Sequence, residues 1–167
     1  IFFIAPALIT ALSVVFLTNS GSESNDLALR LARAHTGGRD MLVLDHAYHG
    51  NLTSLVDLSP YKFNGRGGQG CPPGTHVVPL PDSYRGVLGA EPGPYVSAVR
   101  SLLSDIDAAG RLVGGFISEP MPGTAGQVEL IPGFLAAAYE EVRASGGVCI
   151  ADEVQIGFGR VGVHFWG

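Results

Sequence analysis

The segment "VCIADEVQIGFGR", residues 148–160, decides how the sequence is interpreted. Residues 148–151 are apolar or small, which predicts a buried strand, and this strand runs directly into Asp152 and Glu153. Several glycines follow, as is typical of a loop. Carboxylates at the end of a buried strand occur in P-loop ATPases and in sites that bind a protonated nitrogen, so the rest of the chain must distinguish these two.

Strand and helix patterns alternate along the remainder of the chain, which predicts an α/β domain with a largely parallel sheet. The predicted strands are 14–18, 41–46, 75–80, 112–120 and 148–154, and the predicted helices are 22–35, 94–110 and 132–147. In the first helix Leu27, Leu31 and His35 fall on one face. Residues 60–95 are rich in proline and glycine, and are expected to form a long irregular excursion.

Ligands of such sheets bind at the carboxyl ends of the strands, and this is where the reactive side chains fall. They lie in the segments Asn19–Glu23, His46–Gly50, Glu119 and Asp152–Gln155. We therefore expect one site at this edge of the sheet.

Length and composition restrict the possible classes of protein. A chain of 167 residues with 46% hydrophobic content can form one domain with its own core. The net charge is −5, Lys62 is the only lysine and the arginines are scattered singly, so nucleic acid is not an expected partner. Cys71 and Cys149 lack metal-ligand spacing, which favours a reduced, intracellular protein of the cytoplasm or a mitochondrion.

The first seventeen residues contain no charge and are close to the minimum length of a membrane span. Pro6 interrupts this run, and no basic residue flanks it. The pattern favours an interior strand or helix, and no membrane partner is expected.

Two apparent nucleotide motifs lack the sequence context that they need. A P-loop requires G-x-x-x-x-G-K-[ST], whereas Lys62 lies between Tyr61 and Phe63, so the ATPase interpretation fails within this chain. The segment "GRGGQG" (65–70) satisfies G-x-G-x-x-G, but "SPYKFN" precedes it and "CPPG" follows it. No strand leads into this motif and no helix can begin smoothly after it, which predicts a flexible loop.

Two other segments carry more information. In "TNSGSESND" (18–26) a helix begins near Ser22, so its free N–H groups could bind an anion, although Ser20 and Glu23 also have the spacing of an ordinary capping box. In "DHAYHG" (45–50) Tyr48 offers a flat face to an aromatic ligand. No third ligand has suitable spacing there, so a metal site is not expected.

A single ligand would unite these features if it carried a phosphate, an aromatic ring and a basic ring nitrogen. The helix start at Gly21 and Ser22 would take the phosphate, and Tyr48 would stack on the ring. Asp152 would pair with the nitrogen and keep it protonated, which makes the ring an electron sink. That ligand is pyridoxal 5'-phosphate (PLP).

The sequence resembles the class III, fold type I, PLP-dependent aminotransferases. The motifs "NSGSESND", "AYHG", "SEP" and above all "GGVCIADEVQIGFGR" are similar to that family's motifs in order and spacing. The resemblance covers residues 14–167 and leaves residues 1–13 unmatched. It implies a three-layer α/β fold with a mostly parallel sheet, as part of the family's PLP-binding large domain.

The resemblance also implies a role for each matching residue. Asp152 would be the catalytic partner of the pyridine nitrogen, while Glu153 would be structural. The other implied cofactor-binding residues are Gly21 and Ser22 at the phosphate, Tyr48 on one ring face with His49 adjacent, Val154 on the opposite face, Gln155 at the ring hydroxyl and Glu119 as support.

The family's Schiff-base lysine would lie beyond Gly167, and Lys62 is in the wrong place to replace it. Residues 14–167 are therefore expected to be the central part of the large domain, without the lysine region or the small domain. Such a fragment would be inactive alone. The resemblance further implies that the full-length protein is a homodimer.

The branch of the family stays open. "LDHAYHGNLTSLVDLSPYKF" resembles the phospho-lyases that act on phosphoethanolamine or 5-phosphohydroxylysine, whereas "SEPMPGTAGQ" is nearer to the transaminases. Ile156 stands where many transaminases carry threonine, which favours the lyases. We expect an aminotransferase that uses an amino donor and a 2-oxo acid, with phospho-lyase as the first alternative and an inactive α/β fragment as the second.

Overall fold

The computed structural model describes residues 14–167, and residues 1–13 lie outside the described part. Its elements are α1 (Gly21–Thr36), β1 (Asp40–Leu44), α2 (Thr53–Val56), α3 (Pro60–Phe63), β2 (Thr75–Val78), α4 (Pro92–Ala108), β3 (Val113–Ser118), α5 (Phe134–Ala144) and β4 (Val148–Ala151). The strands form one parallel sheet in the order β2-β1-β3-β4. The predicted α/β class with a parallel sheet is confirmed.

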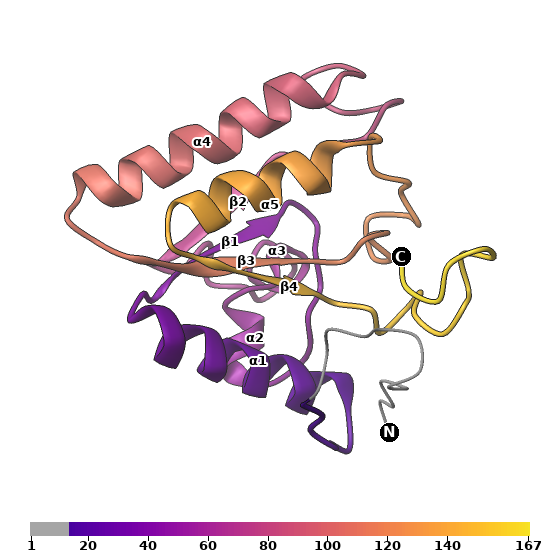
Figure 1. The fold of residues 1–167 in the computed structure, drawn as a ribbon, viewed down its shortest axis with the longest axis horizontal. Helices are drawn as coiled ribbons and strands as arrows, with labels where there is room; N and C mark the ends of the chain where they lie inside the picture. Colours follow the sequence, from indigo (N-terminus) through magenta and orange to yellow (C-terminus); the bar gives the residue numbers. More distant parts are fainter. Residues whose placement is uncertain (1–13) are drawn as a thin grey trace.

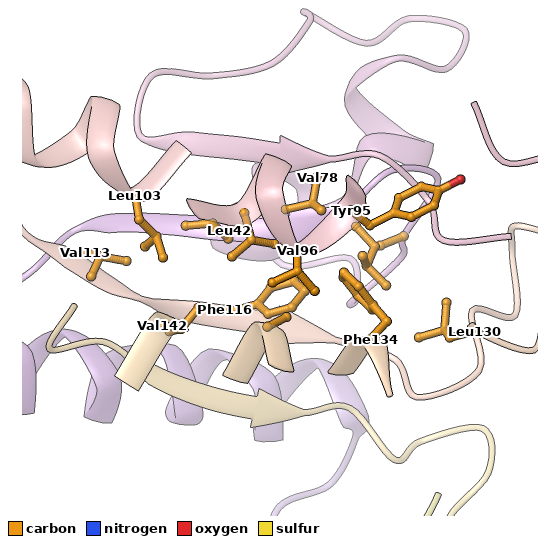
Figure 2. Packing of buried hydrophobic residues seen from close by; sticks show 14 of the residues in the cluster. Leu42, Val78, Tyr95, Val96, Leu103, Val113, Phe116, Leu130, Phe134 and Val142 are labelled. Atoms are coloured by element: carbon orange, nitrogen blue, oxygen red, sulfur yellow. The ribbon is translucent and has the colours of Figure 1, made fainter. Parts of the chain in front are cut away.

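Helices cover both faces of the sheet and give three layers (Figure 1). Helices α4 and α5 lie on one face, while α1 and α2 lie on the other. The cluster beneath α4 and α5 contains Phe116, Tyr95 and Phe134, all fully buried (Figure 2). The second cluster joins Leu29 of α1 and Leu55 of α2 to Met41, Val43 and Ile117 of the sheet.

The central strands β1 and β3 are buried along their whole length because both of their faces are covered. Their sequences, DMLVL and VGGFIS, accordingly do not alternate between polar and apolar residues. Glycine is required at position 115, since a Cβ there would lie 2.3 Å from the carbonyl oxygen of Val148. Gly115 therefore allows β4 to pair closely with β3.

Helix α1 was expected to present Leu27, Leu31 and His35 on one face, but the buried residues are Asn25, Leu29 and Ala32. The three residues do share one face of the helix, but that face lies about a third of a turn away from the buried one. Leu31 is 47% exposed. Leu27 and Leu31 instead border a groove of about 540 Å³ between α1 and β4.

The strand predicted at residues 14–18 is also wrong. Residues 14–18 have no regular secondary structure, and Val14, Phe16 and Leu17 are more than half exposed. No strand of the described sheet pairs with them, so apolar composition alone did not produce a strand. Residues 1–13 of the same apolar run lie outside the described part of the chain.

The predicted irregular excursion at residues 60–95 contains more structure than expected. It includes α3, β2 and the start of α4, which begins at Pro92 rather than at residue 94. The predicted strand at 75–80 is confirmed in its first four residues.

The order of the strands determines where a ligand can approach. The chain adds β2 on one side of β1 and then crosses over to add β3 and β4 on the other side. Parallel sheets form a crevice outside the carboxyl ends of the strands at such a reversal. Within residues 14–167, no helix combines the length and apolar character that a membrane span requires.

Candidate active site

A cavity of about 170 Å³ lies at the carboxyl ends of β1, β3 and β4. Its lining residues are Ser20, Gly21, Ser22, Tyr48, His49, Gly50, Glu119, Thr124, Asp152, Val154 and Gln155. All eight residues that the sequence predicted for the site therefore border one cavity, although they come from four separate segments of the chain.

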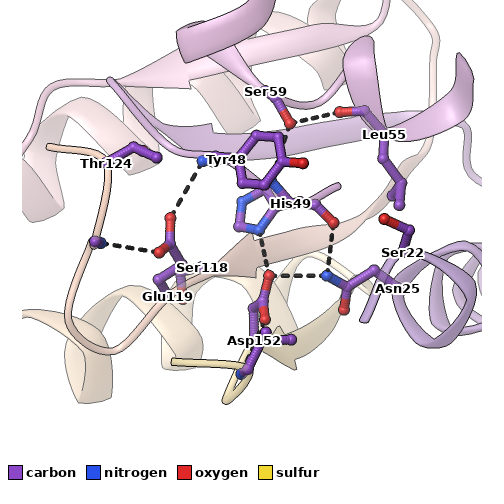
Figure 3. Close-up of polar contacts among 12 residues, drawn as sticks. Ser22, Asn25, Tyr48, His49, Leu55, Ser59, Ser118, Glu119, Thr124 and Asp152 are labelled. Atoms are coloured by element: carbon purple, nitrogen blue, oxygen red, sulfur yellow. Dashed lines mark hydrogen bonds and ion pairs between the residues drawn. The ribbon is translucent and has the colours of Figure 1, made fainter. Parts of the chain in front are cut away.

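Asp152 is the first residue after β4 and is buried, with its side chain 4% exposed. Its Oδ2 accepts hydrogen bonds from Nδ2 of Asn25 and from Nδ1 of His49, both at 2.8 Å. Its Oδ1 accepts a third from the backbone N–H of Val154 at 3.2 Å. Figure 3 shows the three side chains pointing toward one another. Three donors therefore occupy most of the acceptor positions of this buried side chain.

His49 is fixed at both its ring and its backbone. The side chain is completely buried, its N–H donates to Oγ of Ser59 at 2.9 Å, and its carbonyl accepts from Asn25 at 2.9 Å. Because a carboxylate only accepts, Nδ1 must carry the proton. Nε2 is buried and has no partner among the described residues.

The start of α1 presents free donors to the cavity. Oγ of Ser20 caps the helix by accepting from the N–H of Glu23 at 3.1 Å, and Glu23 in turn accepts from the N–H of Asn19. The capping interpretation is thus confirmed. It leaves the N–H groups of Gly21 and Ser22 without a partner within residues 14–167, at the positive end of the helix dipole. Capping and anion binding are therefore compatible here.

The two residues predicted to flank a ring both border the cavity. The ring of Tyr48 meets that of Tyr61 edge-on, with centroids 6.1 Å apart, and Nζ of Lys62 lies 5.5 Å from the Tyr48 centroid. Val154 is 46% exposed, and a Cβ on Gly21 would lie 2.7 Å from its Cγ2. Glycine at position 21 thus leaves room for Val154 beside the helix start.

Glu119 follows β3 and connects two loops of the site. Its Oε1 accepts from the N–H of Tyr48 at 3.2 Å, and its Oε2 accepts from the N–H of Gly123 at 2.9 Å. Burial raises the pKa of this carboxyl above its ordinary value, and the two N–H donors offset part of that rise. Glu119 therefore holds the Tyr48 loop in place at the cost of burying an acid.

Replacing Glu119 with glutamine is expected to destabilise the fold by ~1–3 kcal/mol, because one backbone N–H would then face an amide NH₂. The raised pKa adds a pH dependence. The contribution of Glu119 to the free energy of unfolding is fully present below the ordinary pKa of glutamate. It is lost as pH rises through the higher pKa that the carboxyl has in the folded protein. The free energy of unfolding of both proteins should be measured at pH 5 and pH 8. We expect their difference to shrink at the higher pH, and a difference that grows would contradict this assignment.

A model of the family described as aminotransferase class-III matches residues 4–166. The chain belongs to this family.

Known class-III proteins share both sequence and structure with the chain. A protein of Drosophila melanogaster named alanine–glyoxylate aminotransferase 2-like is 48% identical over 93% of this chain and 33% of its own length. An Arthrobacter phospholyase solved with phosphoethanolamine has a TM-score of 0.79 and 37% identity, over 90% of this chain and 36% of its own. An amine transaminase from an uncultivated Pseudomonas species, in a PLP-bound form, has a TM-score of 0.74 and 25% identity, over 89% of this chain and 35% of its own. The chain thus spans about a third of each.

Sequence reasoning missed two residues that the structure brings to the site. Asn25 binds Asp152, and Thr124 lines the cavity, where its Oγ1 donates to the carbonyl of His46 at 2.7 Å. Asn25 was detectable as the polar member of a helical stripe that continues through Leu29 and Ala32. Thr124 gave no such signal, because its partner is a backbone carbonyl distant in sequence. Within residues 14–167, no cluster of His, Cys, Asp or Glu could hold a metal.

Proposed function

We propose that residues 14–167 are the central part of the PLP-binding large domain of a longer class-III aminotransferase. In this proposal the cavity between α1, β1, β3 and β4 holds the cofactor, and the full-length protein transfers an amino group from an amino acid or amine to a 2-oxo acid. The observation that carries the proposal is the buried Asp152, which three donors support at the carboxyl end of a parallel strand.

The donor set at the start of α1 fits the phosphate of PLP. The unpaired N–H groups of Gly21 and Ser22 would attract a negatively charged group, and the helix dipole would add to this attraction. Oγ of Ser22 already accepts from the N–H of Asn51 at 3.1 Å, which leaves its own proton free to donate. These three donors would hold the phosphate.

The remaining lining residues fit a pyridine ring. Tyr48 and Val154 would pack on its two faces, and the amide of Gln155 would bind the ring hydroxyl. The carboxylate of Asp152 would face the ring nitrogen and hold a proton on it, because a buried anion strongly favours a cation as its neighbour. Glu119 would keep the backbone of Tyr48 in place. When bound, the cofactor supplies an electron sink for the carbon that carries the substrate's amino group.

The lysine that would bind the cofactor covalently is proposed to come from another part of the full-length protein. Lys62 is the only lysine of this chain, and it lies against the rings of Tyr48 and Tyr61 rather than among the residues that line the cavity. We further propose a homodimer. Cys71 and Cys149 are both free thiols, which supports an intracellular compartment, either cytoplasm or mitochondrion.

A phospho-lyase acting on phosphoethanolamine or 5-phosphohydroxylysine is the second candidate. The similarity to the Arthrobacter phospholyase favours it. The Ile156 side chain gives no further evidence, since it is 6% exposed and does not line the cavity within the described residues. The similarity to alanine–glyoxylate aminotransferase 2-like, at 48% identity, favours the transaminase.

The two candidates differ in their need for an oxo acid. Full-length protein loaded with PLP should be incubated with alanine and glyoxylate, and separately with phosphoethanolamine alone. We expect pyruvate and glycine in the first mixture, and little phosphate or ammonia in the second. Stoichiometric release of phosphate and ammonia without an acceptor would instead identify the lyase.

The 167-residue chain is the matched control for this experiment. After treatment with PLP and borohydride, covalent cofactor should be found in the full-length protein and not in this chain. Equal labelling of both proteins would contradict the assignment of the lysine to another segment.

A further inference from the structure

Asn25 is a polar residue in the buried stripe of α1. It is 6% exposed, and the next members of the stripe, Leu29 and Ala32, pack against the sheet. An amide in such a position is costly unless its hydrogen bonds are satisfied. The side chain lies between the end of β4 and the loop after β1, as Figure 3 shows.

Both partners of the Asn25 amide can only accept. Its Nδ2 is 2.8 Å from Oδ2 of Asp152 and 2.9 Å from the carbonyl oxygen of His49. The nitrogen must therefore face them, and both of its N–H groups are used. The amide thus joins three elements at one point: α1, the loop after β1 and the end of β4.

This arrangement makes the two oxygens of Asp152 unequal. Each carboxylate oxygen accepts about two hydrogen bonds. Oδ2 receives Asn25 and His49 and is filled, while Oδ1 receives only the N–H of Val154. One acceptor position remains, and it is on Oδ1.

We propose that Asn25 is a positioning residue, which fixes the rotation of the Asp152 carboxylate so that Oδ1 is the oxygen that binds the ring nitrogen of the cofactor. The inference rests on the proposed PLP site. It adds a residue that acts through Asp152 without touching the ligand.

A pair of ligands separates this role from a merely structural one. In 1-deaza-pyridoxal phosphate the ring nitrogen is replaced by C–H, while the phosphate and the ring remain. Dissociation constants of both ligands should be measured for full-length apo-protein, native and Asn25→Ala. We expect the native preference for PLP over the deaza analogue to fall by about tenfold or more in the variant.

A control variant shows whether any disturbance of α1 has the same effect. Oδ1 of Asp26 accepts from Oγ of Ser54 at 2.6 Å and connects α1 to the α2 segment without reaching Asp152. Asp26→Asn should keep the native preference. If Asn25→Ala weakens both ligands equally, Asn25 is not a positioning residue. If native protein does not bind PLP at all, the proposed function itself fails.

An isosteric variant tests the contact without any cofactor. Asn25→Asp would place a second carboxylate against Asp152. The other titratable neighbours of Asp152 are His49, Glu119 and Glu153, and they are the same in the native protein and the variant. The acid pair must share a proton, and this proton must leave as pH rises. We expect apo-protein with Asn25→Asp to lose stability relative to native between pH 5 and pH 9. A stability difference that does not vary with pH would overturn the inference.

Discussion

Replacing Asp152 with asparagine in the full-length protein is expected to lower turnover by about 10²–10⁴-fold. Removing one member of a buried ion pair costs ~3–5 kcal/mol, and every ~1.4 kcal/mol of lost transition-state stabilisation is a tenfold loss of rate. The donors already present make the effect severe. Asn25 and His49 both donate to Oδ2, so the oxygen of the new amide must take that position. Its NH₂ would then face the ring nitrogen, which could no longer keep a proton.

Turnover of the two proteins should be compared at saturating PLP, so that a loss of affinity is not mistaken for a loss of chemistry. Glu153→Gln provides the matched control. That carboxylate is the neighbour of Asp152 in sequence, but it accepts from the N–H of Gly167 at 3.0 and 3.1 Å. We expect the control to remain within a few-fold of native. Turnover of Asp152→Asn within threefold of native would contradict the proposed role.

Replacing Phe116 with alanine is expected to destabilise the fold by ~3–5 kcal/mol, because the lost burial is combined with a cavity that the sheet cannot close. Phe116 is fully buried in β3, opposite Leu42 and Cys149 of the neighbouring strands. Its ring also meets that of Tyr139 edge-on, with centroids 6.0 Å apart. The free energy of unfolding from urea denaturation measures this loss.

Tyr84→Ala is the comparison for that experiment, because it removes an aromatic ring that is 84% exposed. Surface substitutions of this kind usually change stability by ~0.5 kcal/mol or less. An equal loss in the two variants would show that Phe116 is not part of the core described here.

The sequence predicted the sheet well where strands are buried on both faces. DMLVL and VGGFIS show continuous burial, and their length and flanking turns distinguish them from helices. The site followed from the same pattern. Parallel strands end at one edge, so Tyr48, Glu119 and Asp152 had to lie close together although about 70 and 30 residues separate them in sequence. Their placement around one cavity was predictable, whereas their individual roles remain predictions.

Contacts that depend on tertiary packing were not predictable. Apolar composition at residues 14–18 suggested a strand, yet a strand needs a hydrogen-bonded partner, and none of the described strands pairs with this segment. Which face of α1 is buried also depends on tertiary contacts. Asn25 turns inward because Asp152 and His49 offer it two acceptors. Its spacing from Leu29 and Ala32 places it on the same helix face but does not identify those partners.

We propose that Asp152 keeps the ring nitrogen of bound PLP protonated. The most direct measurement is the ¹⁵N chemical shift of cofactor labelled at that nitrogen, recorded in the full-length protein from pH 6 to pH 9. We expect the shift of a protonated ring throughout this range in native protein, and that of an unprotonated ring in Asp152→Asn. An unprotonated ring in the native protein at neutral pH would contradict it.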